Sequence, residues 1–188
     1  LQVGNSSAIR YVQLFDVDKS IDIFCNRGTS GIDGSTSTAI GAAIANKKQT
    51  VFITGDISFF YDSNALWNNY IPKNFKIIVI NNGGGAEFKI MTDAWKEDVH
   101  VADFISANGH NGSAKGWAEN CGFIYFSATD ESSFEKCFGS GMNAKSITAE
   151  IHCVEVHGKN FFFAVKHLNF DGCCPFFGFH DDEFQPRN

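Results

Sequence analysis

Residues 51–58 read VFITGDIS, so an apolar, β-branched run passes directly into a Gly-Asp pair. Residues 75–85 read FKIIVINNGGG, where a second apolar run ends in two asparagines and three glycines. Continuous apolar runs of this length are typical of strands that are covered on both faces. The two stretches therefore predict two strands of a parallel sheet, each followed by a polar turn.

The rest of the chain alternates between short apolar runs and longer segments with helical character. This alternation predicts an α/β fold with a parallel central sheet and helices on both faces. We expect one domain over residues 1–168 and a C-terminal tail of unassigned role over residues 169–188. The expected strands cover residues 21–25, 50–54, 75–80, 123–126 and 147–153, and the expected helices cover residues 35–46, 63–70, 113–121, 131–138 and 159–168.

Asp56 and Asn82 are the first candidate ligand residues, because each follows one of the two predicted strands. They are 26 positions apart, which leaves room for a loop, a helix and a return strand that brings both to one sheet edge. A carboxylate, an amide oxygen and a backbone carbonyl suit Mg²⁺, and glycines allow a phosphate to approach the backbone closely. The pair therefore predicts a metal–diphosphate site. Alternatively, Gly-Asp only ends a strand and the glycines form a flexible loop.

Composition limits the other function classes. The net charge is −6 without a basic cluster, which argues against nucleic-acid binding. No apolar run approaches the roughly 20 residues that span a bilayer, and the start lacks a signal-peptide pattern, so we expect a cytoplasmic protein without a membrane span. The six cysteines lack paired metal-site spacing, and we interpret them as reduced thiols, including Cys173 and Cys174. Leu1 in place of an initiator methionine indicates a piece of a longer protein.

The Gly-Asp and Asn-Asn pairs together resemble the signature of thiamin-diphosphate-dependent enzymes. Residues 4–10 (GNSSAIR) and 26–34 (NRGTSGIDG) are similar to one family among them, the SEPHCHC synthases of menaquinone biosynthesis. The resemblance is dense over residues 4–85 and looser from residue 112 to residue 168. It implies the thiamin-diphosphate-binding fold of the diphosphate (PP) domain.

The resemblance also implies a cofactor site for thiamin diphosphate with Mg²⁺ or Mn²⁺. The implied metal ligands are the side chains of Asp56 and Asn82 and the carbonyl of Gly84. The implied diphosphate contacts are Ile57 and Ser58, and the implied aminopyrimidine contacts are Gly31 and Ile32, with Ile32 holding the cofactor folded.

Four residues match family positions at the substrates. Ser6, Arg10 and Arg27 correspond to residues that hold substrate carboxylates, a task that suits the permanent charge and paired N–H groups of arginine. Phe88 corresponds to a residue that lines the pocket, whereas Glu87 stands where the family has an apolar residue. Without the resemblance, Arg10 is better interpreted as a helix surface residue and Arg27 as a loop ion pair.

The implied reaction is decarboxylation of 2-oxoglutarate and addition of the succinyl semialdehyde unit to isochorismate. In such enzymes the glutamate that activates the cofactor belongs to a separate pyrimidine-binding domain, usually of a neighbouring subunit. No segment of this chain resembles that domain, so we assign no catalytic residue, expect the chain alone to be inactive, and expect a homodimer or tetramer for the full-length enzyme. Two alternatives stay open: an acetolactate-synthase-like enzyme, and a non-catalytic nucleotide-binding module, whose GxGxxG turn residues 28–31 do not fit.

Overall fold

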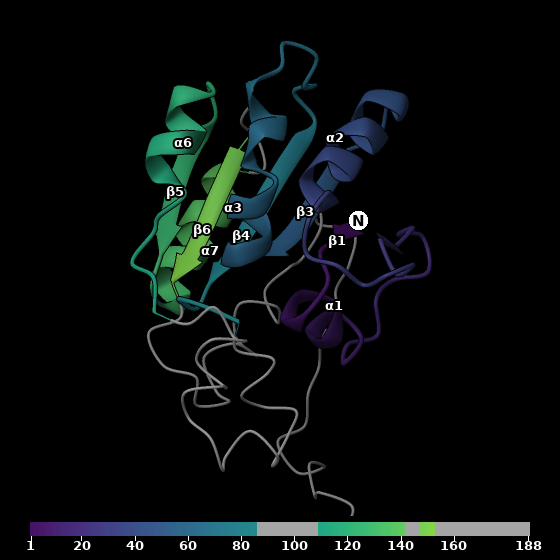
Figure 1. Cartoon of the computed structure of the whole chain (residues 1–188), viewed down its shortest axis with the longest axis horizontal. Helices are drawn as coiled ribbons and strands as arrows, with labels where there is room; N and C mark the ends of the chain where they lie inside the picture. The colour runs from purple at the N-terminus through teal and green to yellow at the C-terminus, as the bar shows by residue number, and fades with distance from the viewer. Residues whose placement is uncertain (86–108, 142–146, 153–188) are drawn as a thin grey trace, which may run out of the picture.

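The described residues form a six-stranded sheet at the centre of the protein (Figure 1). The computed structural model describes residues 1–85, 109–141 and 147–152. The strand order is β2-β1-β3-β4-β6-β5, and every neighbouring pair is parallel. The predicted α/β class with a parallel central sheet is confirmed. Parallel strands all end at the same edge, so the residues that follow them meet there.

The strands differ greatly in length. The long β3 and β4 pair from Thr50 opposite Phe75 to Gly55 opposite Ile80, so both end at the same level of the sheet. This register places Asp56, directly after β3, beside the last residues of β4. The six strands are β1 (Gln2–Val3), β2 (Phe24–Cys25), β3 (Thr50–Gly55), β4 (Phe75–Asn81), β5 (Ile124–Ala128) and β6 (Ile147–His152).

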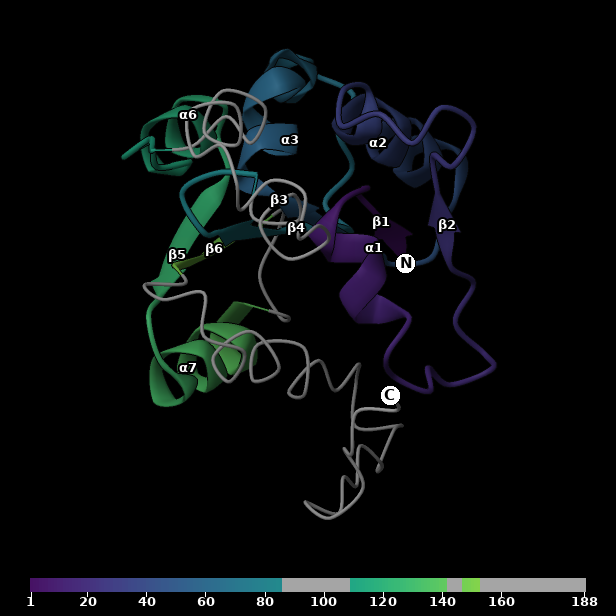
Figure 2. The ribbon, with the colours of Figure 1, turned by 60° about the horizontal axis from the view of Figure 1, so that its bottom comes forward.

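Helices cover both faces of the sheet, as the alternation predicted. Figure 2 separates the layers, with α1 and α7 on one face and α2, α3 and α6 on the other. The helices are α1 (Ser7–Val12), α2 (Ser35–Ala45), α3 (Asp56–Tyr61), the 3-10 helix η1 (Ser63–Trp67), α6 (Lys115–Asn120) and α7 (Glu131–Gly141).

The side chains of the central strands alternate between two buried clusters. In β3, Val51 and Ile53 pack with residues of α1 and α7, whereas Phe52 packs with residues of α2 and α3. In β4, Ile78 and Ile80 join the first cluster, and the intervening apolar residues join the second. Successive strand residues point to opposite faces, so a strand that is apolar throughout can be buried on both sides, which explains the uninterrupted runs in the sequence.

The predicted elements agree with the structure where the apolar runs are long. The strands predicted over residues 50–54, 75–80 and 147–153 are confirmed within a few residues, and so is the helix over residues 35–46. The helices predicted over residues 113–121 and 131–138 appear as α6 and α7, and the strand over 123–126 appears as β5. The helix predicted over residues 159–168 and the tail over residues 169–188 lie outside the described residues.

Two expectations need correction, and three elements were missed. The strand over residues 21–25 is only Phe24–Cys25, which pairs with the two-residue β1 at the edge of the sheet, where Ile23 and Phe24 are exposed. The helix over residues 63–70 is the short 3-10 helix η1, which ends where the Asn68 side chain donates to the Ala65 carbonyl at 2.6 Å. The elements β1, α1 and α3 were not predicted. In α3, weak helix formers are held by tertiary packing, since Phe59 is 0% exposed.

Candidate functional site

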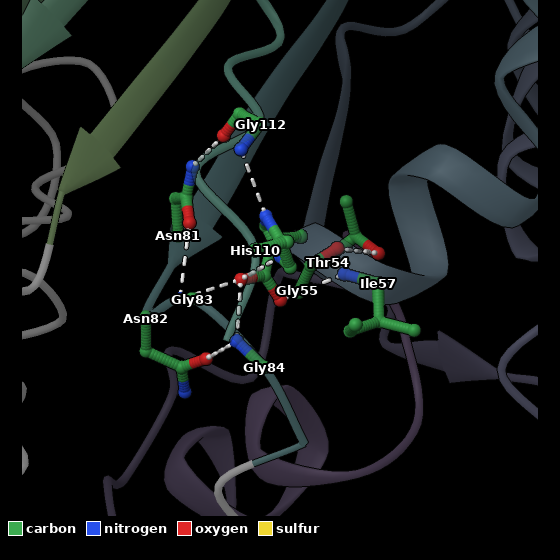
Figure 3. Close-up of polar contacts among 10 residues, drawn as sticks. Thr54, Gly55, Ile57, Asn81, Asn82, Gly83, Gly84, His110 and Gly112 are labelled. Carbon is green, nitrogen blue, oxygen red and sulfur yellow. Dashed lines mark hydrogen bonds and ion pairs between the residues drawn. The ribbon is translucent and has the colours of Figure 1, made fainter. Parts of the chain in front are cut away.

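Asp56 is the first residue of α3 and directly follows β3. It is buried, at 2% exposure. Its Oδ1 accepts a hydrogen bond from the Ile57 N–H at 2.7 Å, and its Oδ2 accepts from the Gly83 N–H at 2.8 Å and the Gly84 N–H at 3.1 Å (Figure 3). Burial raises the pKa of the Asp56 carboxyl above its ordinary value, and the contacts with Ile57, His110 and Gly83 oppose that shift. The loop after β4 thus directs its backbone donors onto the carboxylate after β3.

The Asn82 side chain converges on the same point. Its Oδ1 accepts a hydrogen bond from the Gly84 N–H at 3.3 Å, and this N–H also reaches Asp56 Oδ2 at 3.1 Å (Figure 3). Gly83 has a φ of 75°, a left-handed conformation that glycine adopts without strain. The structure therefore brings together the three residues that the resemblance implied as metal ligands.

His110 is a site residue that the sequence analysis missed. Its Nε2 lies 3.0 Å from Asp56 Oδ2, and its ring packs edge-on against Phe60 with centroids 5.5 Å apart. The Gly112 N–H donates to Nδ1 at 3.0 Å, so Nδ1 carries no proton, and Nε2 carries it and donates to the carboxylate. The His110 backbone N–H in turn donates to the Gly83 carbonyl at 3.4 Å. No periodicity or spacing in the sequence indicates this contact, because it joins two loops.

The loop after β2, residues 26–34, is held by side chains from two other strand ends. The Asn5 Nδ2 donates to the Gly31 carbonyl at 2.6 Å, and the Ser58 Oγ donates to the Ile32 carbonyl at 2.6 Å. Ser58 is buried and Ile32 is half-buried. The contact between Ser58 and Ile32 places Ile32 and its neighbour Gly31 next to the start of α3. The four predicted cofactor residues therefore lie together, since Ile57 and Ser58 belong to α3.

The predicted substrate residues follow β1 and β2, which are neighbours in the sheet. Arg27 is exposed, and its Nη1 donates to Asn5 Oδ1 at 2.9 Å. Ser6 has a φ of 65°, and its hydroxyl makes no capping hydrogen bond to α1. Arg10 lies on the exposed side of α1. Asn5 was also missed as a site residue, although it belongs to the quoted GNSSAIR stretch, because one buried amide gives no periodic signal.

Some predicted residues cannot be compared with the structure. Phe88, Glu87, Cys173 and Cys174 lie outside the described residues. In the part of the chain that the structure describes, no group of three or more His, Cys, Asp or Glu side chains could hold a metal ion. The described helices include none that is long and apolar enough to cross a membrane.

The ligand set fits a hard cation. Asp56 offers a carboxylate, Asn82 an amide oxygen and Gly84 a backbone carbonyl, and Mg²⁺ and Mn²⁺ prefer oxygen ligands of this kind. The Asp56 carboxylate now accepts four hydrogen bonds, three from backbone N–H groups and one from His110. A buried anion requires hydrogen-bond donors or a cation as partners. The loop after β4 supplies donors to Asp56 through Gly83 and Gly84, and it also places the Asn82 amide oxygen nearby.

The fold is an α/β domain in which the residues that follow the parallel strands gather at the carboxyl edge of the sheet, the place where domains of this architecture bind their ligands. Residues 2–152 match the family of C-terminal TPP binding domains of thiamine pyrophosphate enzymes, and the chain belongs to this family. Thiamine pyrophosphate is thiamin diphosphate under another name. The family and its cofactor, which the resemblance implied, are therefore confirmed.

The curated relatives narrow the comparison further. Proteins named 2-succinyl-5-enolpyruvyl-6-hydroxy-3-cyclohexene-1-carboxylate synthase match from Flavobacterium psychrophilum, at 55% identity over 80% of this chain, and from Flavobacterium johnsoniae, at 58% over 72%. A protein of the same name from Bacteroides fragilis is 43% identical over 80% of this chain. The matched region covers 27%, 24% and 27% of these three proteins, so the chain spans about a quarter of their length.

Proposed function

We propose that this chain is the cofactor-binding domain of a SEPHCHC synthase, the enzyme named in full in its relatives. The complete enzyme decarboxylates 2-oxoglutarate and adds the succinyl semialdehyde unit to isochorismate in menaquinone biosynthesis. The observation that carries the proposal is the Gly84 N–H shared by Asp56 Oδ2 at 3.1 Å and Asn82 Oδ1 at 3.3 Å. This convergence of two oxygen ligands supports a cation site in a chain that is 55% identical to a synthase of this name.

The cofactor role of each residue follows from its chemistry. Asp56, Asn82 and the Gly84 carbonyl would hold Mg²⁺ or Mn²⁺, which neutralises a diphosphate. Ile57 and Ser58 would contact the diphosphate. The Ser58 hydroxyl and the Ile57 N–H would donate to its oxygens in place of their present acceptors, the Ile32 carbonyl and Asp56 Oδ1. Gly31 and Ile32 would contact the aminopyrimidine, with Ile32 as the bulky side chain against which it folds. Thiamin diphosphate, when bound, supplies the electron sink for decarboxylation.

The residues that would bind the substrates follow β1 and β2. Both substrates carry two carboxylates, and an arginine binds a carboxylate through two parallel, charge-assisted hydrogen bonds. Arg27 is exposed and uses one N–H on Asn5 at 2.9 Å, which leaves its other N–H groups for a ligand. Ser6 offers a hydroxyl that does not cap α1. We assign these residues and Arg10 to the substrate carboxylates, and Phe88 to the pocket wall.

The activating glutamate would come from the remainder of the enzyme. The chain covers 27% of its Flavobacterium psychrophilum relative, so most of such an enzyme lies beyond this domain. We assign the glutamate to a pyrimidine-binding domain of a second subunit in a cytoplasmic homodimer or tetramer. The isolated domain is then inactive, because it holds the cofactor without the group that activates it.

The test is a turnover assay of the complete enzyme that carries this chain. With Mg²⁺, thiamin diphosphate, 2-oxoglutarate and isochorismate, we expect release of CO₂ and a product of the mass of the joined skeleton. Pyruvate alone should yield no acetolactate. Acetolactate from pyruvate, or no CO₂ from 2-oxoglutarate in an enzyme that binds the cofactor, would contradict the proposal. The isolated domain serves as a negative control.

The two arginines provide a sharper test of the substrate class. In the complete enzyme, Arg27→Ala and Arg10→Ala should each lower kcat/KM by roughly 10- to 100-fold, since a hydrogen bond to a charged group contributes roughly 1.5–3 kcal/mol. The dissociation constant of thiamin diphosphate should stay unchanged. Normal turnover by both variants would make these arginines structural and remove the support for a dicarboxylate substrate.

A further inference from the structure

Asn5 lies at the end of β1 and is buried, at 1% exposure. Its Nδ2 donates to the Asn26 carbonyl at 2.7 Å and to the Gly31 carbonyl at 2.6 Å. Its Oδ1 accepts from Arg27 Nη1 at 2.9 Å and from Cys25 Sγ at 3.3 Å. An amide side chain has two donor hydrogens and two acceptor lone pairs, so all four hydrogen-bonding positions of Asn5 are filled.

The partners fix the orientation of this amide. Both carbonyls can only accept and the guanidinium can only donate, so the nitrogen and oxygen of Asn5 cannot exchange places. Burial raises the pKa of the Cys25 thiol above its ordinary value, which the charge of Arg27 opposes, so the thiol stays protonated and able to donate. A rigid amide therefore joins Arg27 on one side to Gly31 on the other.

Attachment of the loop after β2 does not by itself explain why Asn5 Oδ1 accepts a hydrogen bond from Arg27. The two donor bonds suffice to attach the loop after β2 to β1, whereas the bond from Arg27 orients an exposed side chain. Long exposed side chains lose conformational freedom when they are ordered, so an arginine that is already held loses less of it when a ligand binds. In the described residues, the other N–H groups of Arg27 have no hydrogen-bond partner.

The backbone on both sides of Asn5 holds its amide in the orientation that contacts Arg27. A Cβ on Gly4 would lie 2.9 Å from Thr54 Oγ1, so only glycine permits this approach of β1 to β3. Ser6, on the other side, takes a φ of 65° that serine rarely adopts. Between these two constraints the chain turns sharply after β1, with Asn5 buried and Ser6 half-buried.

We propose that Asn5 is a positioning residue that holds Arg27 for the substrate carboxylate and Gly31 for the aminopyrimidine, so that one amide sets the distance between substrate and cofactor. This inference rests on the proposed function, because it takes the roles of Arg27 and Gly31 from there. It adds a residue that touches neither ligand and acts through two that do.

Two Asn5 variants distinguish the donor bonds of Nδ2 from the acceptor bond that Oδ1 makes with Arg27. Asn5→Asp keeps the acceptor for Arg27 but loses both donors and turns a charge toward two carbonyls. In the complete enzyme it should raise the dissociation constant of thiamin diphosphate about tenfold or more while changing the KM for 2-oxoglutarate little, since an unsatisfied buried group costs more than a lost surface bond. Asn5→Ala should raise both quantities, and Arg27→Ala only the KM.

The double variant Asn5→Ala/Arg27→Ala tests whether Asn5 acts through Arg27. Its KM should equal that of Arg27→Ala, because contacting residues that act together are not additive. Asn74→Ala is the matched control. Its amide donates to carbonyls at the opposite edge of the sheet, with Lys48 as the nearest at 2.5 Å, so it should lower the melting temperature without changing either quantity.

Three results overturn the inference: Asn5 and Arg27 effects on KM that multiply, an Asn5→Asp enzyme with normal cofactor affinity, or equal changes in the Asn74 control. An inactive wild-type enzyme would overturn the proposed function instead. In that case the Arg27 half of the inference falls with the proposed function, and the cofactor dissociation constants of the Asn5 variants, measured by tryptophan fluorescence without turnover, decide the Gly31 half.

Discussion

Two side chains at the carboxyl edge, Asp56 and Asn5, each take part in four hydrogen bonds, and they do so in opposite ways. Asp56 accepts hydrogen bonds only, four of them, and burial raises the pKa of its carboxyl. Asn5 donates two hydrogen bonds and accepts two, without a charge. The Asn5 amide is neutral and all four of its hydrogen-bonding positions are filled, so we expect it to keep these partners. A buried carboxylate that accepts hydrogen bonds from N–H groups can exchange some of these donors for a cation. We therefore call Asn5 the fixed half of the site, because its hydrogen bonds persist, and Asp56 the exchangeable half, because a cation can replace some of its donors.

The largest expected effect tests the exchangeable half. Asp56→Ala removes the one carboxylate among the proposed metal ligands, so Mg²⁺-dependent binding of thiamin diphosphate should weaken by at least about 100-fold, more than the loss of a supporting residue around a metal usually costs. Isothermal titration of the complete enzyme with cofactor, in Mg²⁺ and in EDTA, measures this. Wild-type affinity in Asp56→Ala would refute the metal assignment, provided that the circular dichroism spectrum shows an intact fold.

The next effect tests the fixed half. Gly4→Ala places a Cβ 2.9 Å from Thr54 Oγ1 and 3.3 Å from Thr54 Cα, so the free energy of unfolding should fall by about 1–3 kcal/mol through overpacking. Gly41→Ala is the control, because its Cβ meets no atom within 4 Å on the exposed side of α2. That variant should gain about 0.5–1 kcal/mol from helix propensity. Equal changes in urea-unfolding midpoints would contradict the tight fit after β1.

A smaller effect asks whether the donors on Asp56 compete with a cation. His110 donates to Asp56 Oδ2 from Nε2 at 3.0 Å. His110→Ala removes one competing hydrogen bond, which should tighten Mg²⁺ binding about tenfold, the lower end of what a hydrogen bond to a charged group contributes, because Asp56 keeps its three backbone donors. Calorimetric titration with Mg²⁺ measures this in the absence of cofactor. Weaker Mg²⁺ binding would mean that His110 supports the bound state.

The smallest effect contrasts Asp56 with an exposed carboxylate that lies outside the proposed metal site. Hydrogen bonds from the Ser133 backbone and hydroxyl hold the pKa of Asp130, just before α7, below its ordinary value. A carboxyl whose pKa is lowered by folding stabilises the protein above about pH 4 and loses this contribution as the pH falls through the lower, folded pKa. Asp130→Asn should therefore lower the melting temperature at pH 7 and converge with wild type in strong acid. Its Mg²⁺ affinity should equal that of wild type.

The parts of the fold that were predictable are those where local pattern and burial agree. The runs that form β3 and β4 are buried on both faces, so their uninterrupted apolar character indicated strands, and the richness of α2 in small residues indicated a helix. The two-residue strand β1 is too short to have a period. The helix α3 begins at the predicted ligand itself, and its aromatic residues favour a strand when they are considered without their tertiary contacts.

The site was predictable only where the chain carries a recognisable stretch. Asp56 and Asn82 follow long strands, so topology predicts their approach, and the shared Gly84 N–H agrees with it. Asn5 and His110 act through contacts between loops that are distant in sequence. The contact of His110 with Asp56 spans 54 positions, a separation that no local pattern encodes.

The strand order has a consequence for how this chain is made. The strand β6 lies between β4 and β5, although it is synthesised after both. During synthesis, β5 therefore leaves the ribosome before its partner exists, since in the described sheet it pairs with β6 alone. The strands from β1 to β4 can join each other first, and residues 147–152 then connect β5 to them in one late step. Because non-local pairing of this kind is slow and leaves strand edges open, the nascent chain has its greatest need of a chaperone just before its sheet closes.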